Sequence, residues 1–320
     1  MRYLSLPGDV VLRYPVISGF RWILMLAVGF STQVMASESP SPLLERLRRG
    51  ERLMFIGAHP DDELAVAPLL ARAADTTDVM VVCMTNGGGG QNRGGTSLSQ
   101  SLGEVRAQEL DASCRVLGVE HTLLAFQNDI PVEERLRRRR EGSPENPSQV
   151  IERWRGNGHD LLEILVEHIR RWKPNVVIGF DPDQGFTSHK EHRAAGSLAL
   201  AAVQKAGDPG HRQTELSPWS VKRMYAVVNR FATERHPSIP EIDSGRIVEV
   251  ISGEDRSAKR GKSYIEIGMH AMSQHQSQFG GEFLTAVRRS IFHREMLEQA
   301  LTLEYPPNAE EYAQPDNGSS

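Results

Sequence analysis

The chain is poor in cysteine and in aromatic residues. It has two cysteines among 320 residues, and aromatic residues make up only 6% of the sequence. Two cysteines are too few for a cysteine-based zinc site. Cys83 and Cys114 both lie in apolar stretches. We therefore expect two free, buried thiols, and a disulfide between them is the alternative.

The chain also lacks a strong excess of charge of either sign. Its formal net charge is −4, from 37 basic and 41 acidic residues. Such a chain has no global field that would attract nucleic acid or an anionic membrane. With 39% hydrophobic and 24% charged residues it has the composition of a globular protein, long enough for one large domain or two modest ones.

The N-terminal apolar run, WILMLAVGF at residues 22–30, is too short for a stable membrane helix. Arg21 precedes it, and STQVMA, which ends in small residues, follows it. This is the order of a secretory signal. We therefore expect a signal peptide over residues 1–36, cleaved after Ala36, and an exported protein in the periplasm or outside the cell. A start farther along the chain and an uncleaved membrane anchor are the alternatives.

The rest of the chain alternates between apolar runs and helical patterns. The apolar runs at 53–58, 78–85, 121–126 and 175–180 are typical of buried strands. Amphipathic patterns at 61–74, 101–118, 161–172 and 191–206 predict helices. This alternation predicts an α/β fold, a Rossmann-like, mainly parallel sheet flanked by helices, with the active site at the C-terminal ends of the strands.

The predicted domain covers residues 51–304, after a linker and lead-in at 37–50. A charged insertion interrupts it at about residues 133–158. The part at 135–148, RLRRRREGSPENPS, is either a solvated loop, which we favour, or an anion-binding segment. Residues 305–320 are expected to be a disordered tail.

A histidine and three acids follow the first predicted strand in one tight turn: His59, Asp61, Asp62 and Glu63. Carboxylates at this density repel one another and resist desolvation, and a bound cation would relieve both costs. His59 and Asp62 can converge on one metal, which leaves Asp61 free to act on a bound water. The alternative is that the acids only cap the next helix. A cap needs one acid, however, and does not account for the histidine.

Two further histidines, His189 and His192, follow the strand predicted at 175–180. A zinc hydrolase needs three protein ligands and one open position for water. His59, Asp62 and one histidine of this pair would complete such a set. For either histidine alone, a plain surface position is the alternative.

These motifs resemble those of the PIG-L, or LmbE-like, family of zinc-dependent N-acetylglucosaminyl deacetylases. LMFIGAHPDDELA resembles the family's AHPDDE signature, MTNGGGG its T-x-G loop, EVRAQELDASCRVLGV its R-x-x-E-L helix and TSHKEHRAA its H-P-D-H segment. WSVKRMYAVV and HQSQ resemble later elements, so the likeness covers about residues 50–280. The chain departs from the pattern where Lys-Glu replaces Pro-Asp and in the insertion at 135–148.

The resemblance implies a Zn²⁺ cofactor and assigns roles to seven residues: His59, Asp62 and His192 as zinc ligands, Asp61 as general base, His189 as the group that stabilises or protonates the transition state, and Arg106 and Asp129 as substrate-binding residues. The reaction implied is removal of an N-acetyl group from an N-acetylglucosamine-containing glycan or glycoconjugate, giving acetate and a free amine. A structural ion pair is the alternative for Arg106.

Other functions fit the sequence less well. The Gly-rich loop at 87–95 has neither G-x-G-x-x-G nor the lysine of a P-loop, which argues against nucleotide binding. An amidase of the same family acting on a thiol conjugate or a lipopeptide is one alternative, and a non-catalytic glycan-binding module is another. Export would favour an envelope glycan over a cytosolic thiol as the substrate.

Overall fold

The computed structural model describes residues 41–95, 97–98, 100–128, 137, 140–141, 145–156, 158–211, 215–229, 244–281 and 292–306. The predicted signal peptide and the predicted substrate residue Asp129 lie outside these residues. The elements are, in chain order, α1 (Pro42–Arg48), β1 (Leu53–Gly57), η1 (Asp62–Val66), α2 (Ala67–Ala73), β2 (Val79–Cys83), α3 (Leu102–Leu117), β3 (Glu120–Leu123), α5 (Pro147–Arg155), α6 (Leu161–Trp172), β4 (Val176–Phe180), α7 (Lys190–Gly207), β5 (Arg223–Val228), η2 (Ser244–Arg246), β6 (Ile247–Ser252), α9 (Tyr264–Met272), α10 (Gln276–Phe279) and β7 (Glu298–Tyr305).

One sheet of seven strands, in the order β3-β2-β1-β4-β5-β7-β6, forms the centre of this unit. The first five strands in this order run parallel to one another. Strand β7 is antiparallel to both of its neighbours, β5 and β6. The predicted α/β fold with a mainly parallel sheet is therefore confirmed, and the apolar runs predicted as strands form β1 to β4.

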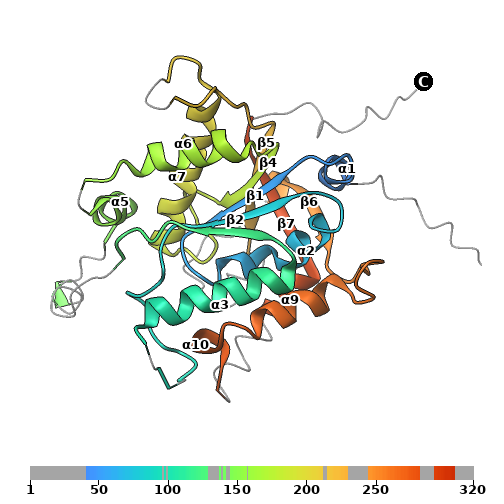
Figure 1. The fold of residues 1–320 in the computed structure, drawn as a ribbon, viewed down its shortest axis with the longest axis horizontal. Coiled ribbons are helices and arrows are strands. Elements are labelled where there is room, and N and C mark those ends of the chain that lie inside the picture. The colour runs from blue at the N-terminus through green and yellow to red at the C-terminus, as the bar shows by residue number, and fades with distance from the viewer. Residues whose placement is uncertain are drawn as a thin grey trace, which may run out of the picture. The chain divides into compact units, whose positions relative to one another are not determined.

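The two central strands, β1 and β4, are buried at every position. Their sequences, LMFIG and VVIGF, are continuous apolar runs because helices cover both faces of the sheet. Helices α2, α3 and α9 lie on one side of the strands, and α5, α6 and α7 lie on the other (Figure 1).

The strand order also positions the functional groups. From β1 the chain crosses to β2 on one side, and from β4 it crosses to β5 on the other. Neighbouring strands whose connections leave in opposite directions open a crevice at their carboxyl ends, where ligands bind in open α/β sheets. His59 lies in the segment that follows β1, and His189 and His192 lie in the segment that follows β4.

Three features differ from the sequence-based expectations. The lead-in before residue 51 is helix α1, whose leucines are buried and whose Leu43 N–H donates to Glu249 Oε1 at 2.8 Å. The helix predicted over 61–74 begins as the 3₁₀ turn η1, and α2 starts at Ala67. Strands β6 and β7 add an antiparallel edge that no sequence pattern had indicated. Cys83 and Cys114 are free and buried, as expected.

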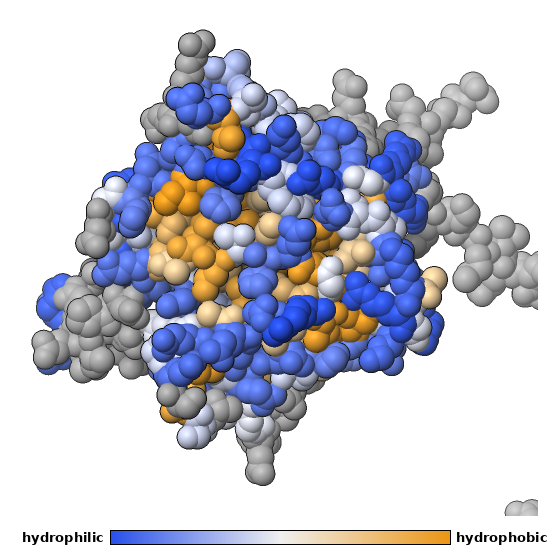
Figure 2. Space-filling view, in the orientation of Figure 1, coloured by the Kyte–Doolittle hydropathy of each residue, from blue (hydrophilic) through white to orange (hydrophobic). Residues whose placement is uncertain are grey.

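The face of the molecule seen in Figure 1 is mixed in polarity. Figure 2 shows apolar residues gathered in the middle of this face, with hydrophilic residues around them. Edge strand β3 is only half buried at three of its four positions. Among the described residues, no helix is long and apolar enough to cross a membrane.

Candidate active site

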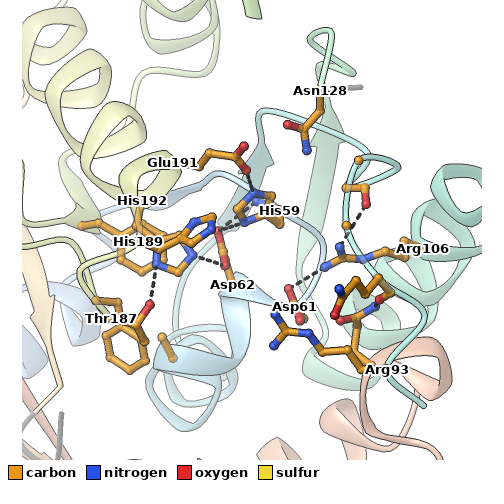
Figure 3. A pocket seen from close by; sticks show the side chains of 18 of the residues that line it. His59, Asp61, Asp62, Arg93, Arg106, Asn128, Thr187, His189, Glu191 and His192 are labelled. Carbon is orange, nitrogen blue, oxygen red and sulfur yellow. Dashed lines mark hydrogen bonds and ion pairs between the residues drawn. The ribbon is translucent and has the colours of Figure 1, made fainter. Parts of the chain in front are cut away.

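A cavity of about 500 Å³ lies at the carboxyl ends of β1 and β4. The polar groups that line it come from six separate segments of the chain. They include every described residue that the sequence analysis had assigned to the site: His59, Asp61, Asp62, Arg106, His189 and His192. Figure 3 shows the histidines and Asp62 on one side of the cavity and Asp61 and Arg106 on the other.

Three histidines form a group that can hold a metal ion. One ring nitrogen of each of His59, His189 and His192 lies within 4.8 Å of the other two. His59 follows β1, His189 is the N-cap of α7, and His192 lies in the first turn of α7. The ring of His192 stacks on Phe180 at the end of β4, with 4.4 Å between ring centroids. The convergence of these side chains follows from the adjacency of β1 and β4.

Asp62 belongs to the same centre. Its Oδ2 accepts hydrogen bonds from the backbone N–H groups of Ala58 at 2.7 Å and His59 at 2.9 Å. The same oxygen lies 3.6 Å from His59 Nδ1, and Oδ1 lies 3.1 Å from His192 Nε2. The predicted set of His59, Asp62 and His192 is thus brought together, and His189 stands beside it.

The electrostatics of this centre favour a cation. Burial disfavours the charged form of His59, but Asp62 and Glu191 outweigh it and raise the pKa of His59 to about 10. Burial likewise opposes ionisation of Asp62, yet His192 and His59 hold its pKa well below the usual range. Burial, together with His192 and His59, lowers the pKa of His189 to about 3. An ionised carboxylate among converging imidazoles has the donor chemistry of a zinc site.

Asp61 turns away from this centre. Its backbone is left-handed, with a φ of 109°, a conformation that costs a residue with a side chain about 1–3 kcal/mol. The backbone N–H of Asp61 donates to Glu63 Oε2 at 3.1 Å, which helps to hold the turn. The side chain therefore faces the cavity beside the metal ligands and is not tied to them.

Arg106 is paired with Asp61. Arg106 Nη2 donates to Asp61 Oδ1 at 2.8 Å and to the carbonyl of Pro60, and Nη1 donates to the carbonyl of Gly87 at 3.2 Å. Gly87 has a φ of +67°, and a Cβ there would lie 2.4 Å from Arg106 Nη1. Only glycine at position 87 of the Gly-rich loop leaves room for the guanidinium of Arg106. Both the ion pair and the cavity-lining position that we had weighed for Arg106 are present.

Two groups of residues near the site were not assigned a role from the sequence. Glu191 Oε2 contacts His59 Nε2, and Glu191 Oε1 accepts from Arg153 Nη2 at 2.6 Å. On the other side of the turn, Glu63 Oε1 accepts from Ser113 Oγ and from His275 Nε2, each at 2.6 Å. A signal for the second group did exist, since Glu63 ends the AHPDDE motif and His275 begins the HQSQ element.

The comparison with known families agrees with this geometry. Residues 54–203 match the PIG-L family model, described as GlcNAc-PI de-N-acetylase. The chain carries a PIG-L domain. The resemblance that we inferred from the AHPDDE motif and the segments after it is therefore confirmed. The match includes β1 to β4 and His59, Asp62 and His192, and it ends within α7.

Similar proteins place the PIG-L domain among enzymes. The chain is 31% identical over 187 residues to a 1D-myo-inositol 2-acetamido-2-deoxy-alpha-D-glucopyranoside deacetylase of Thermomonospora curvata, a match that covers 55% of this chain and 59% of the relative. The chain thus spans less than two thirds of that relative's length.

Solved structures show the same fold. The N,N'-diacetylchitobiose deacetylase of Pyrococcus horikoshii superposes with a TM-score of 0.54 and 19% identity, covering 82% of this chain and 89% of that one. A 4-carboxy-2-hydroxymuconate hydratase of Pseudomonas putida also gives a TM-score of 0.54, with 13% identity, covering 81% of this chain and 98% of the hydratase. Because a deacetylase and a hydratase match equally well, the fold alone does not select the reaction.

The comparisons contradict our prediction that the chain is exported. Relatives that it matches, such as those of Thermomonospora curvata and Catenulispora acidiphila, are named as deacetylases of a sugar joined to inositol, and their names do not describe an exported enzyme of envelope glycans. The segment around residues 21–36 suggested a signal because a short apolar run beside one arginine meets the hydropathy pattern of a signal with little specificity. The preference for an envelope glycan as substrate rested on export and falls with it.

Proposed function

We propose that the protein is a zinc-dependent deacetylase that hydrolyses the N-acetyl amide of a molecule containing N-acetylglucosamine. The observation that carries this proposal is the convergence of His59, His189 and His192 with Asp62 between two of them, and with Asp61 beside this group at the cavity. A metal ligand set next to an unligated carboxylate is the arrangement that metal-assisted hydrolysis of an amide requires.

His59, Asp62 and His192 would hold the zinc ion. Bound there, zinc would supply Lewis acidity, which would polarise the acetyl carbonyl and lower the pKa of a water from its bulk value to about 7. The described geometry supports these three ligands because Asp62 already lies between the two imidazoles, 3.6 Å from one and 3.1 Å from the other.

Asp61 is the proposed general base. Its carboxylate accepts a proton from the attacking water while the water oxygen forms a bond to the acetyl carbon. Arg106 keeps one oxygen of Asp61 oriented through the hydrogen bond of 2.8 Å and leaves the other facing the cavity. The C–N bond then breaks, and Asp61 passes its proton to the leaving nitrogen, which gives acetate and a free amine.

His189 is proposed to stabilise the oxyanion from the other side. Its lowered pKa means that the imidazole is neutral at pH 7, so it carries one N–H that can donate a hydrogen bond to the negative oxygen. Arg106 and Asp129 are proposed to bind the sugar. Asn128, which precedes Asp129, lines the cavity.

The substrate class is supported by the relatives. The relative from Thermomonospora curvata is a deacetylase of a 2-acetamido-2-deoxyglucose joined to inositol, and the similar fold of Pyrococcus horikoshii belongs to a diacetylchitobiose deacetylase. Both names describe an acetamide on a glucosamine ring. We infer the same acetamide for this chain, and an N-acylated thiol conjugate or lipopeptide remains the alternative.

The test measures the carboxylic acid and the free amine that the zinc-loaded protein releases from a matched panel of compounds. The panel contains N-acetylglucosamine, N-acetylglucosaminyl-inositol, diacetylchitobiose, an N-acetylated cysteine conjugate and an N-acyl lipopeptide. We expect acetate from at least one of the sugars and no carboxylic acid from the last two. Turnover of the last two alone would favour the alternative amidase. Binding of the sugars without turnover would favour a glycan-binding module.

A further inference from the structure

A buried cluster of charges lies behind the proposed metal site. Arg153 on α5 donates from Nε and Nη2 to the two oxygens of Glu145, each at 3.0 Å. Lys190 Nζ lies 2.9 Å from Glu145 Oε2, and Arg153 Nη2 also donates to Glu191 Oε1 at 2.6 Å. The side chain of Glu145 is 0% exposed, and those of Arg153 and Glu191 are each 10% exposed.

The cluster connects segments that are far apart in the sequence. Glu145 lies in the segment expected to be a solvated insertion, and Arg153 lies on the helix that follows it. Lys190 and Glu191 stand where the family pattern has Pro-Asp. Arg153 Nη1 also donates to Asn128 Oδ1 at 2.7 Å, beside the end of β3. The two places where the chain departs from the family pattern therefore meet in one ionic network.

Stability alone does not account for such a network. Burying several charges costs desolvation energy, and apolar residues of the same volume often stabilise a fold as well or better. Burial opposes ionisation of Glu145, yet Arg153 and Lys190 outweigh it and lower the pKa of Glu145. What the network produces is a fixed carboxylate: Arg153 holds one oxygen of Glu191, and the other oxygen contacts His59 Nε2.

The orientation of His59 depends on that contact. A metal-binding histidine usually donates the N–H of its other ring nitrogen to a carboxylate, which fixes its tautomer and its ring orientation. With Glu191 on Nε2, the proton of a neutral His59 resides there. Nδ1, the nitrogen that faces Asp62, is left with the lone pair that a metal needs.

We propose that Arg153 and Glu145 form a brace that positions the metal site: they hold Glu191 so that His59 presents Nδ1 to the ion. The proposal rests on the metal site of the proposed function. Arg153 and Glu145 are positioning residues, because they act on the ion only through Glu191 and His59.

The test measures zinc affinity by chelator competition and site geometry by the visible spectrum of the Co²⁺-substituted protein. Arg153→Met should weaken zinc binding about tenfold, the lower end of the effect of residues that orient ligands, and should shift the Co²⁺ bands. The matched control is Arg155→Met on the same helix. Arg155 is 48% exposed and pairs with Glu152 at 3.0 Å, so zinc affinity should not change.

Two further variants separate positioning from folding. In Glu145→Met/Arg153→Met both members of the ion pair are replaced by apolar side chains, which should restore the stability lost in Arg153→Met. Zinc affinity should stay low, because Glu191 still lacks its hydrogen bond from Arg153. In a Glu191→Gln background, adding Arg153→Met should weaken zinc binding little further, because both changes act through one residue.

Three results would overturn the brace. They are a folded Arg153→Met protein with wild-type zinc affinity and Co²⁺ spectrum, a double variant that regains zinc affinity together with stability, and fully additive losses in the Glu191→Gln background. If the wild-type protein binds no zinc, the proposed function fails with it. If the wild type binds zinc and deacetylates while Arg153→Met binds zinc equally well, the brace alone fails.

Discussion

Asp61→Asn and Asp62→Asn should have opposite defects, although the two residues are neighbours with the same chemistry. In Asp61→Asn the amide oxygen can still accept from Arg106, so the free energy of unfolding should fall by only about 1 kcal/mol. The zinc ligands are untouched. The general base is lost, however, which should lower kcat by about 10²–10⁴-fold, or about 3–5 kcal/mol of transition-state stabilisation.

Asp62→Asn should instead lose zinc. One oxygen of Asp62 accepts from two backbone N–H groups, and the other faces His192. The amide of asparagine has only one oxygen. In one orientation its NH₂ group faces the two backbone N–H donors, and in the other it takes the place of the oxygen that faces the metal. We expect a loss of about 1–3 kcal/mol in stability and a large loss of zinc affinity, because the ligand no longer carries a charge.

The assay combines metal analysis of each purified variant with acetate release at increasing zinc concentration. Excess zinc should restore part of the activity of Asp62→Asn and none of the activity of Asp61→Asn. Rescue of Asp61→Asn with no rescue of Asp62→Asn would show that the two roles are reversed. Full activity in both variants would refute the catalytic interpretation of this turn.

Three further predictions concern the surroundings of the site. Gly87→Ala should abolish most activity, because its Cβ would lie 2.4 Å from Arg106 Nη1. Gly95 also has a positive φ, +65°, but has open space around it, so Gly95→Ala should lose only stability. Equal activity of the two variants in the acetate assay would contradict this. His275→Ala should lower the free energy of unfolding in urea by about 3–5 kcal/mol, because buried Glu63 loses its cationic partner and keeps Ser113 and the Asp61 N–H. A loss below about 1 kcal/mol would contradict a buried ion pair between Glu63 and His275. Zinc added to chelator-stripped protein should raise its Tm by mass action, and an unchanged Tm would argue against a metal site.

The fold and the position of the site could be predicted from local patterns. The continuous apolar runs of β1 and β4 identify central parallel strands, and residues that follow such strands meet at one edge of the sheet. His59, Asp62 and the pair His189 and His192 could therefore be placed together from the sequence, and the choice of His192 as the third ligand came from the family resemblance. The antiparallel strands β6 and β7 could not be predicted from local patterns, because their pairing depends on contacts between distant segments.

The network around the site was beyond local patterns for the same reason. Glu63 and His275 are 212 residues apart, and Arg153 and Glu191 are 38 apart. Arg153 and Glu191 look like ordinary surface charges in the sequence. Glu63 and His275 lie in recognisable motifs, but only the fold shows that they pair. The insertion was expected to be solvated because it is rich in arginine, but Glu145 near its end is buried by Arg153 from the following helix.

Zinc-dependent deacetylation can be measured by titrating zinc into chelator-stripped protein and following acetate and free amine released from N-acetylglucosaminyl-inositol. We predict no release without metal, equal amounts of the two products, and activity that rises with zinc and saturates at one equivalent per chain. Acetate release that is unaffected by removing the metal, or a zinc-loaded protein that releases neither product from any N-acetylated sugar, would contradict this prediction.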